Sequence, residues 1–190
     1  MKKYPMLEKK MSELIELQKK NETQLAKTDA QLAKTDAQLA KTDAQLSRTT
    51  EILSNIGINL GKVTEEYFYD TLKEKMSLGE IKFDAISFNL QHKYKNKQDE
   101  FNIVMYNGKA LAIIEIKHKV HPSDLEKLSS KKVESFRELF PQYKHHKIYL
   151  GIGGFSIPES IVKEALKKGI AVLKQKGEVT LIRDEKLKAY

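Results

Sequence analysis

Apolar residues recur every seven positions over the first third of the chain. The stretch LAKTDAQ occurs three times in succession between Leu25 and Gln45. With leucine at heptad position a, one register extends in both directions and spans residues 7–63. Position a then holds a row of leucines: Leu25, Leu32, Leu39, Leu46, Leu53 and Leu60. A seven-residue period of this kind predicts a coiled-coil helix over residues 1–60 that pairs with another chain into a homo-oligomer.

Heptad position d is less apolar than position a. It holds threonine through the repeats and becomes apolar again at Ile56 and Val63. Gln18 and Asn21 also place polar side chains in the seam, and such residues set register or oligomer state at a cost in stability. The alternative is a single solvated helix without a stable partner. In either case the segment serves spacing or assembly.

A second domain follows over residues 61–190. Gly57 and Gly61 disfavour a helix interior, so we place the boundary here, although the helix can also continue through them. The next apolar pattern predicts a helix over residues 63–76 with Thr64 as a possible N-cap. Glu65 falls on the apolar side of that helix. It is either a candidate site residue or a carboxylate placed favourably at the helix dipole.

Two short apolar stretches around Asn107-Gly108 form the central feature of this domain. They span Asp99–Lys117, and Asn-Gly predicts a hairpin with a two-residue type I′ turn. That turn places Glu100 opposite Glu115, and side-chain alternation puts four polar residues on one face: Glu100, Asn102, Glu115 and Lys117. The other face carries Phe101, Ile103, Ala112, Ile114 and Ile116. Charged groups among so many apolar residues are costly unless they pair or bind a cation, which makes them candidate site residues.

The remaining pattern alternates strands and helices. A strand over residues 81–90 precedes the hairpin, and residues 91–98 form a turn or strand end. After the hairpin we expect a helix over residues 121–140, a strand over 147–152, a helix over 157–168, and two strands over 170–173 and 179–182. Gly151, Gly153 and Gly154 lack a phosphate-loop spacing and indicate a bend at a strand end. The core order is therefore α-β-β-β-α-β, which predicts an α/β fold.

The composition limits the kinds of partner and of binding site that the chain can have. The net charge of +8 and pI of about 9.3 suit a polyanion, although lysine-rich proteins are common. The chain has no cysteine, which excludes disulfides and zinc-thiolate sites. Neither a signal peptide nor a membrane span is expected, so we predict a soluble, cytoplasmic protein. The four histidines between positions 118 and 146 lack a metal-binding spacing such as H-E-x-x-H, which favours surface loops.

Lysines also gather in the sequence beside the hairpin. Those that are candidates to hold a phosphate backbone are Lys117, Lys119, Lys127, Lys131, Lys132, Lys144 and Lys147. The alternative is a solvated helix face.

The element order, with Glu65 on the first helix and Glu115-Ile116-Lys117 on the third strand, resembles the PD-(D/E)XK nuclease superfamily, also called the restriction-endonuclease-like fold. The stretches GKVTEEYFYDTL, KKVESFRELFPQYK and GIAVLKQKGEV are also similar to a family of small uncharacterised bacterial proteins with a heptad-repeat N-terminus. The resemblance implies a mixed sheet flanked by helices and a nuclease that acts on DNA with Mg²⁺ or Mn²⁺. By the same resemblance, Glu65, Glu115 and the position of Asn102 form the metal shell, with Glu100 beside them as a further candidate ligand, and Lys117 orients water or stabilises the charged transition state.

One position departs from that pattern. Asn102 stands where the superfamily has an aspartate, and an amide supplies an oxygen but no negative charge. Either Glu100 on the same face supplies the missing carboxylate, or the domain is a degenerate nuclease fold that serves binding or assembly.

Overall fold

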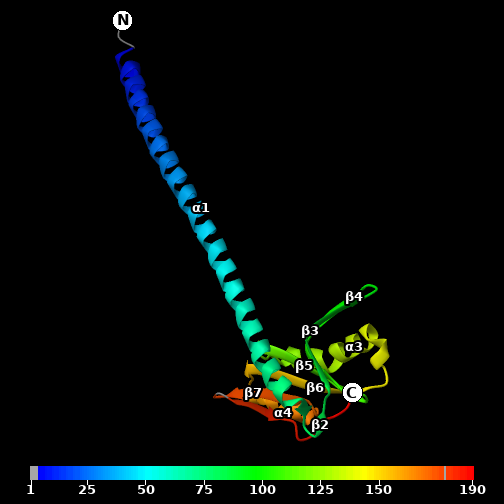
Figure 1. The fold of residues 1–190 in the computed structure, drawn as a ribbon. Coiled ribbons are helices and arrows are strands. Elements are labelled where there is room, and N and C mark those ends of the chain that lie inside the picture. Colours follow the sequence, from blue (N-terminus) through cyan, green and yellow to red (C-terminus); the bar gives the residue numbers. More distant parts are fainter. Residues whose placement is uncertain (1–3, 178) are drawn as a thin grey trace. The chain divides into compact units, whose positions relative to one another are not determined.

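The computed structural model describes residues 4–177 and 179–190, and these form two compact units. The first unit ends at Ile56 and the second begins at Gly57. Helix α1 (Pro5–Lys75) belongs to both units and runs without a break through Gly57 and Gly61 (Figure 1). Pro5 suits its first turn, where the missing N–H is not needed. The alternative that the helix continues through both glycines is confirmed, and the possible N-cap at Thr64 is wrong because Thr64 lies inside α1.

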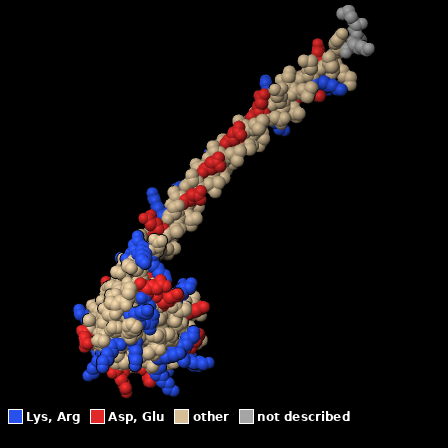
Figure 2. All heavy atoms as spheres, turned by 90° about the vertical axis from the view of Figure 1, so that its right-hand side faces the viewer, with Lys and Arg blue, Asp and Glu red and all other residues tan. Residues whose placement is uncertain are grey.

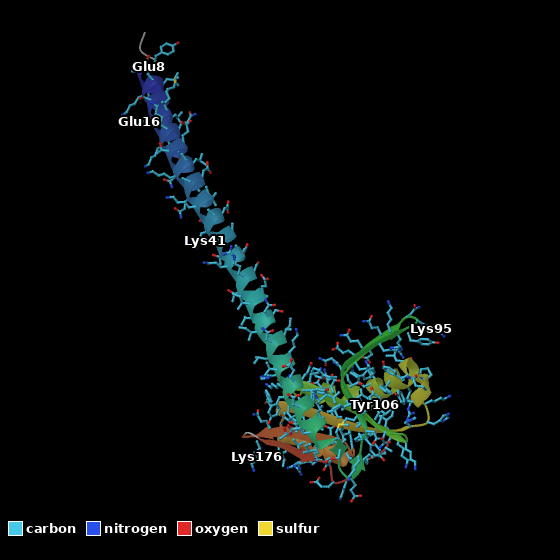
Figure 3. All side chains as sticks on the ribbon, in the orientation of Figure 1. Glu8, Glu16, Lys41, Lys95, Tyr106 and Lys176 are labelled. Carbon is cyan, nitrogen blue, oxygen red and sulfur yellow. The ribbon has the colours of Figure 1, made fainter. Side chains whose placement is uncertain are left out.

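The regular structure described in the first unit is the part of helix α1 that ends at Ile56. Its heptad leucines are exposed, with exposed fractions of 62% for Leu25, 55% for Leu32, 57% for Leu39 and 64% for Leu46. The threonines at position d donate their hydroxyls to carbonyl oxygens four residues earlier in the helix, as Thr35 does to Gln31 at 3.0 Å. Figure 3 shows the side chains of this unit spread along the helix, Lys41 among them. The single chain thus leaves its whole apolar seam uncovered.

The second unit is an α/β structure built on a mixed six-stranded sheet. Its strands lie in the order β3 (Ala85–Tyr94), β4 (Lys97–Tyr106), β5 (Ala110–Lys119), β6 (Lys147–Ser156), β7 (Ala171–Lys176) and β8 (Val179–Arg183). The pairs β3–β4, β4–β5 and β7–β8 are antiparallel, whereas β5–β6 and β6–β7 are parallel. A separate small hairpin pairs β1 (Ser77–Leu78) with β2 (Ile81–Lys82).

Short helices fill the connections that the parallel strands require. Between β5 and β6 lie α2 (Pro122–Lys127), the π-helical segment η1 (Leu128–Lys132), α3 (Val133–Leu139) and the 3₁₀ turn η2 (Pro141–Tyr143). Helix α4 (Glu159–Lys167) joins β6 to β7. Among the described helices, none is long and apolar enough to cross a membrane.

The sheet is buried on both faces by two apolar clusters. One cluster contains Phe68 and Leu72 of α1 together with Ile103, Ile114 and Leu173 of the sheet. The other cluster packs the opposite face against the connecting helices, with members such as Leu125, Phe136 and Val162. Because strand β5 lies between the two layers, its residues from Ala110 to Ile116 are all buried. Polar side chains can therefore be accommodated at the ends of this central strand without exposing the apolar core to solvent.

The predicted α-β-β-β-α-β order and the α/β class are confirmed. Several boundaries differ from the prediction, among them the following three. The strand expected over residues 81–90 begins at Ala85 and continues to Tyr94, because its polar end pairs with β4. The helix expected over residues 121–140 is interrupted by the π-helical segment. Strand β6 does not end before its glycines but includes Gly151, Gly153 and Gly154.

The register of the central hairpin was predicted wrongly. Ile103 pairs with Ile114, so the strands are offset by two residues from the predicted pairing of Glu100 with Glu115. Asn107 causes the shift: its Oδ1 accepts hydrogen bonds from the backbone N–H groups of Lys109 (2.9 Å) and Ala110 (2.7 Å). The turn is therefore centred one residue later, and Gly108 does not have a positive φ. Since the offset is an even number, it leaves the faces of β5 unchanged.

The prediction for Phe101 is also wrong. It packs in the cluster of Phe136 and Phe140, whereas Ile103 lies in the cluster on the opposite face. Regular alternation would put Phe101 and Ile103 on one face, so strand β4 changes its facing at Asn102. On the neighbouring strand, Asn89 lies between the paired positions opposite Asn102 and has a φ of 48°. This distortion turns the Asn102 side chain toward a polar cluster.

Candidate functional site

The carboxyl end of strand β5 carries the polar pair that the sequence singles out. Glu115 and Lys117 line a pocket of about 180 Å³ together with residues of α2 and η1: Asp124, Lys127, Leu128 and Lys132. Larger hollows of about 290 Å³ and 320 Å³ lie against β8 and contain none of the predicted site residues. The small pocket is therefore the one that combines buried polar groups with the predicted chemistry.

Glu115 is held by lysines on two sides. The residue is 9% exposed, and its Oε1 lies 2.7 Å from Lys117 Nζ. Its other oxygen, Oε2, lies 3.9 Å from Lys132 Nζ and is buried without a hydrogen-bond donor. Burial acts to lower the pKa of Lys117, but the charge and hydrogen bond of Glu115 outweigh it and raise that pKa above its ordinary value. Lys117 is thus kept charged beside the pocket.

Lys132 comes from the π-helical segment and connects the pocket to strand β4. Its Nζ donates to Asp99 Oδ1 at 2.7 Å and to the backbone carbonyl of Glu100, and it lies 4.9 Å from the centre of the Phe101 ring. Burial acts to raise the pKa of Asp99. Hydrogen bonds from Lys132 and Ser135 outweigh that effect and hold this pKa below its usual value. A π-helical turn often marks a functional position, and here it supplies a lysine to the pocket.

A second polar cluster joins α1 to strands β3 and β4. Glu65 accepts hydrogen bonds from Asn102 Nδ2 at 3.0 Å and from Asn89 Nδ2 at 3.2 Å. Asn102 is 7% exposed, and its Oδ1 accepts the backbone N–H of Ile116 at 2.9 Å. Burial raises the pKa of the Glu65 carboxyl, an effect reduced by the hydrogen bond from Asn89 and the charge of Lys117. The Asn102 amide thus bridges the helix carboxylate and the strand that carries Glu115.

Four of the five predicted site residues form two contacting pairs in the structure, and Glu100 belongs to neither pair. Glu65 and Asn102 are hydrogen-bonded to each other, and Glu115 and Lys117 form an ion pair. The two pairs are close enough that the charges of Lys117 and Glu115 influence the pKa of Glu65. Glu100 is exposed and accepts Lys132 with its backbone carbonyl. Within residues 4–177 and 179–190, no three acidic or histidine side chains form a ready-made metal-binding group.

Three residues of these clusters were not predicted as site residues. Asp124 and Lys132 line the pocket, and Asn89 binds Glu65. The sequence HPSD places Asp124 in the first turn of α2, where its Oδ2 accepts the N–H of His121 at 2.8 Å, and that pattern was a usable signal. Lys132 was recognised only as one of many lysines. The positive φ of Asn89 left no signal in the sequence pattern.

The histidines do not gather into a site. His118 Nδ1 lies 3.2 Å from the Thr64 hydroxyl, and its ring packs edge-on against Phe155. His92 packs on Phe140, and His146 on Tyr143. These are packing contacts, and His118 lies in strand β5 rather than in the expected surface loop.

Comparison with known proteins adds little to this geometry. No family model matches the chain, and no curated protein matches it. One similar solved structure is the crystal structure of a protein of unknown function, AF1548, with 13% sequence identity and a TM-score of 0.36. The match covers 57% of this chain and 55% of that one.

Proposed function

We propose that the second unit is a divalent-metal-dependent phosphodiester hydrolase that acts on DNA, with Glu115 and Lys117 at its centre. The observation that carries this proposal is Glu115 Oε2, a buried carboxylate oxygen without a hydrogen-bond donor beside a pocket. A buried anionic oxygen is costly unless it is paired or binds a cation, and Lys132 at 3.9 Å is too far away for a hydrogen bond. The resemblance to the PD-(D/E)XK nucleases agrees with this proposal.

The donor set of the pocket suits Mg²⁺ or Mn²⁺. Mg²⁺ is usually held by one or two carboxylates and keeps several waters, and the pocket offers Glu115 and Asp124. When bound, the ion supplies an activated water and neutralises the charge that develops on the phosphate. Lys117 fixes the orientation of Glu115 through their ion pair, while Lys127 and Lys132 add positive charge that favours a phosphate group.

This proposal does not use three of the predicted metal ligands as direct ligands: Glu65, Glu100 and Asn102. Asn102 positions strand β5 through Ile116, and Glu65 fixes the Asn102 amide in turn. Glu100 is exposed at the edge of the site. Its carboxylate can accept a hydrogen bond from a water molecule bound to the metal ion, or it can face solvent. Their direct binding of a metal ion stays a prediction.

The second candidate function is a non-catalytic binding or assembly module with a nuclease-like fold. The Asn102 side chain favours it, because its carbonyl already accepts the N–H of Ile116 and its NH₂ group already donates to Glu65. A metal ion that used the Asn102 oxygen would have to compete with that backbone hydrogen bond. In both functions helix α1 assembles the chains into a homo-oligomer through residues 7–63, which is supported by the uncovered leucine seam.

A cleavage and binding experiment on the full chain separates the two functions. The hydrolase proposal expects Mn²⁺ to bind in calorimetry and expects cutting of single- or double-stranded DNA that stops with EDTA. Glu115→Gln and Lys117→Met should each abolish cutting while each variant keeps a single cooperative thermal unfolding transition. Glu134→Gln, an exposed carboxylate on α3, is the matched control. A protein that binds no divalent metal and cuts neither form of DNA supports the binding module instead.

A further inference from the structure

The coil of the first unit carries a repeated charge pattern beside its uncovered seam. With leucine at position a, position e holds Asp29, Asp36 and Asp43, and position g holds Gln24, Gln31, Gln38 and Gln45. Figure 2 shows acidic side chains at regular intervals along this helix. None of the ion pairs found between described residues involves these aspartates. Their charges are therefore free to act on a neighbouring helix.

Positions e and g lie beside the seam of a coiled coil and determine how two helices are oriented. In a parallel pair, each g residue faces the e residue of the following heptad in the partner. Gln31 then faces the partner's Asp36, and its amide NH₂ can donate to that carboxylate. In an antiparallel pair, e faces e, so the repeated aspartates meet one another and repel. The charge pattern thus favours parallel helices.

The polar residues of the seam can determine the register of a pair of helices. The three LAKTDAQ units are nearly identical, so a slip of seven residues leaves most of the contacts between two repeat segments unchanged. Gln18 at position a and Asn21 at position d break this equivalence. In a parallel pair without a slip each meets its own copy, whereas a slip places Asn21 against Thr28 and Gln18 against Leu25. A polar seam residue paired with itself is a known means of fixing register.

Threonine at position d is compatible with such a pair. The hydroxyls of Thr28, Thr35, Thr42 and Thr49 already donate to carbonyl oxygens of their own helix at 2.9–3.0 Å. A hydroxyl that is satisfied within its own helix enters the seam without the cost of an unpaired donor. The threonine layers therefore weaken the seam relative to leucine but do not forbid it.

We propose that the uncovered seam of the first unit binds a second copy of the same chain, parallel and in register. This inference rests on the homo-oligomer of the proposed function and adds its orientation; it does not depend on catalysis. A parallel pair brings the two Ile56–Gly57 junctions to one end of the coil. An antiparallel pair separates them by the length of residues 7–56, about 75 Å at 1.5 Å per residue.

Single cysteine variants of the full chain test orientation and register together, because the protein has no cysteine of its own. Leu25→Cys and Leu46→Cys, made separately, should both give disulfide-linked dimers under mild oxidation, since each cysteine meets its own copy. Ala30→Cys at position f is the matched control and should stay uncrosslinked. An antiparallel pair can align at most one of the two sites, and a slipped parallel pair aligns neither. Either result overturns the proposal.

A charge variant gives a second readout of orientation. In a parallel pair, the double variant Gln31→Lys/Gln38→Lys places lysines against the partner's aspartates and should raise the unfolding midpoint of the coil. In an antiparallel pair the lysines meet one another, and the midpoint should fall. Ala30→Lys/Ala37→Lys adds the same charge at position f as a control. Sedimentation equilibrium completes the test: a monomer overturns both the pairing and its orientation, whereas a dimer that fails to crosslink keeps the pairing and overturns the parallel, in-register arrangement.

Discussion

Asn102 donates its side-chain amide to Glu65 at 3.0 Å while its own carbonyl oxygen accepts the backbone N–H of Ile116 at 2.9 Å. One side chain thus links helix α1, strand β4 and strand β5 at the point where the ladder between β4 and β5 ends. Asn102 therefore has a bridging role in the fold of the second unit.

Asn102→Asp tests that interpretation. The aspartate can still accept the Ile116 N–H, but it loses the donor to Glu65 and places a second carboxylate beside it. Without metal at pH 7, we expect the free energy of unfolding to fall by about 1–3 kcal/mol, measured by urea denaturation. Mn²⁺ should recover part of this loss if the site accepts a cation. Unchanged stability without metal would contradict the bridging role of Asn102, and Asn89→Asp is a useful comparison because it also loses a donor to Glu65.

Glu65 should give stability a distinct pH dependence. Burial raises the pKa of this carboxyl in the folded protein above its value in the unfolded chain. The folded state therefore binds more protons between those two pKa values, and this group makes the protein less stable as pH rises through that window. Glu65→Gln removes the effect, so the stability of the variant relative to the parent should increase from about pH 4 to pH 7. Urea denaturation at several pH values measures it, and a relative stability that falls over this range would oppose the assignment.

The α/β class and the α-β-β-β-α-β order could be predicted because they depend on apolar periodicity, which the sequence displays directly. The pairing of Glu115 with Lys117 also followed from alternation along one strand. The hairpin register could not be predicted, because the Asn107 side chain replaces the expected type I′ turn with its own hydrogen bonds. An Asn-Gly pair is equally consistent with both turns.

The partners of Asn102 depend on long-range contacts. Glu65 is 37 residues away along the chain, and the facing of Phe101 changes because strand β4 is distorted at Asn102. Local alternation carries no signal for such a distortion. The continuity of α1 through Gly57 and Gly61 has a similar cause, since the packing of Phe68 and Leu72 against the sheet stabilises the helix beyond its local propensity.

Lys132 should be required for the geometry of the pocket as well as for its charge. Lys132→Met removes its hydrogen bonds to Asp99 and to the Glu100 carbonyl, and we expect a loss of about 1–3 kcal/mol of unfolding free energy at pH 7. Asp99 has a lowered pKa in the folded state, so the stability it contributes is present above its unfolded pKa and is lost as pH falls through the folded one. The difference between the parent and Lys132→Met should therefore shrink in acid. Lys131→Met, at an exposed neighbouring position, is the control. If the difference in unfolding free energy between the parent and Lys132→Met does not change with pH, Lys132 does not act through Asp99.

Gly154 allows strand β6 to approach the site strand closely. A Cβ atom at this position would lie 2.5 Å from the Lys117 carbonyl oxygen and 3.0 Å from Val120 Cγ2, and the first contact is with backbone that cannot move away alone. Gly154→Ala should therefore displace the end of β5 and cost about 1–3 kcal/mol of unfolding free energy, measured by thermal or urea denaturation. The displacement should also move Glu115 and Lys117, so the affinity of the proposed site for a metal ion should fall together with stability. Gly108→Ala is the matched control, because a Cβ there meets no atom within 4 Å and its stability should stay near that of the parent. If the two alanine variants are equally stable, the close approach of β6 to Lys117 does not limit the fold.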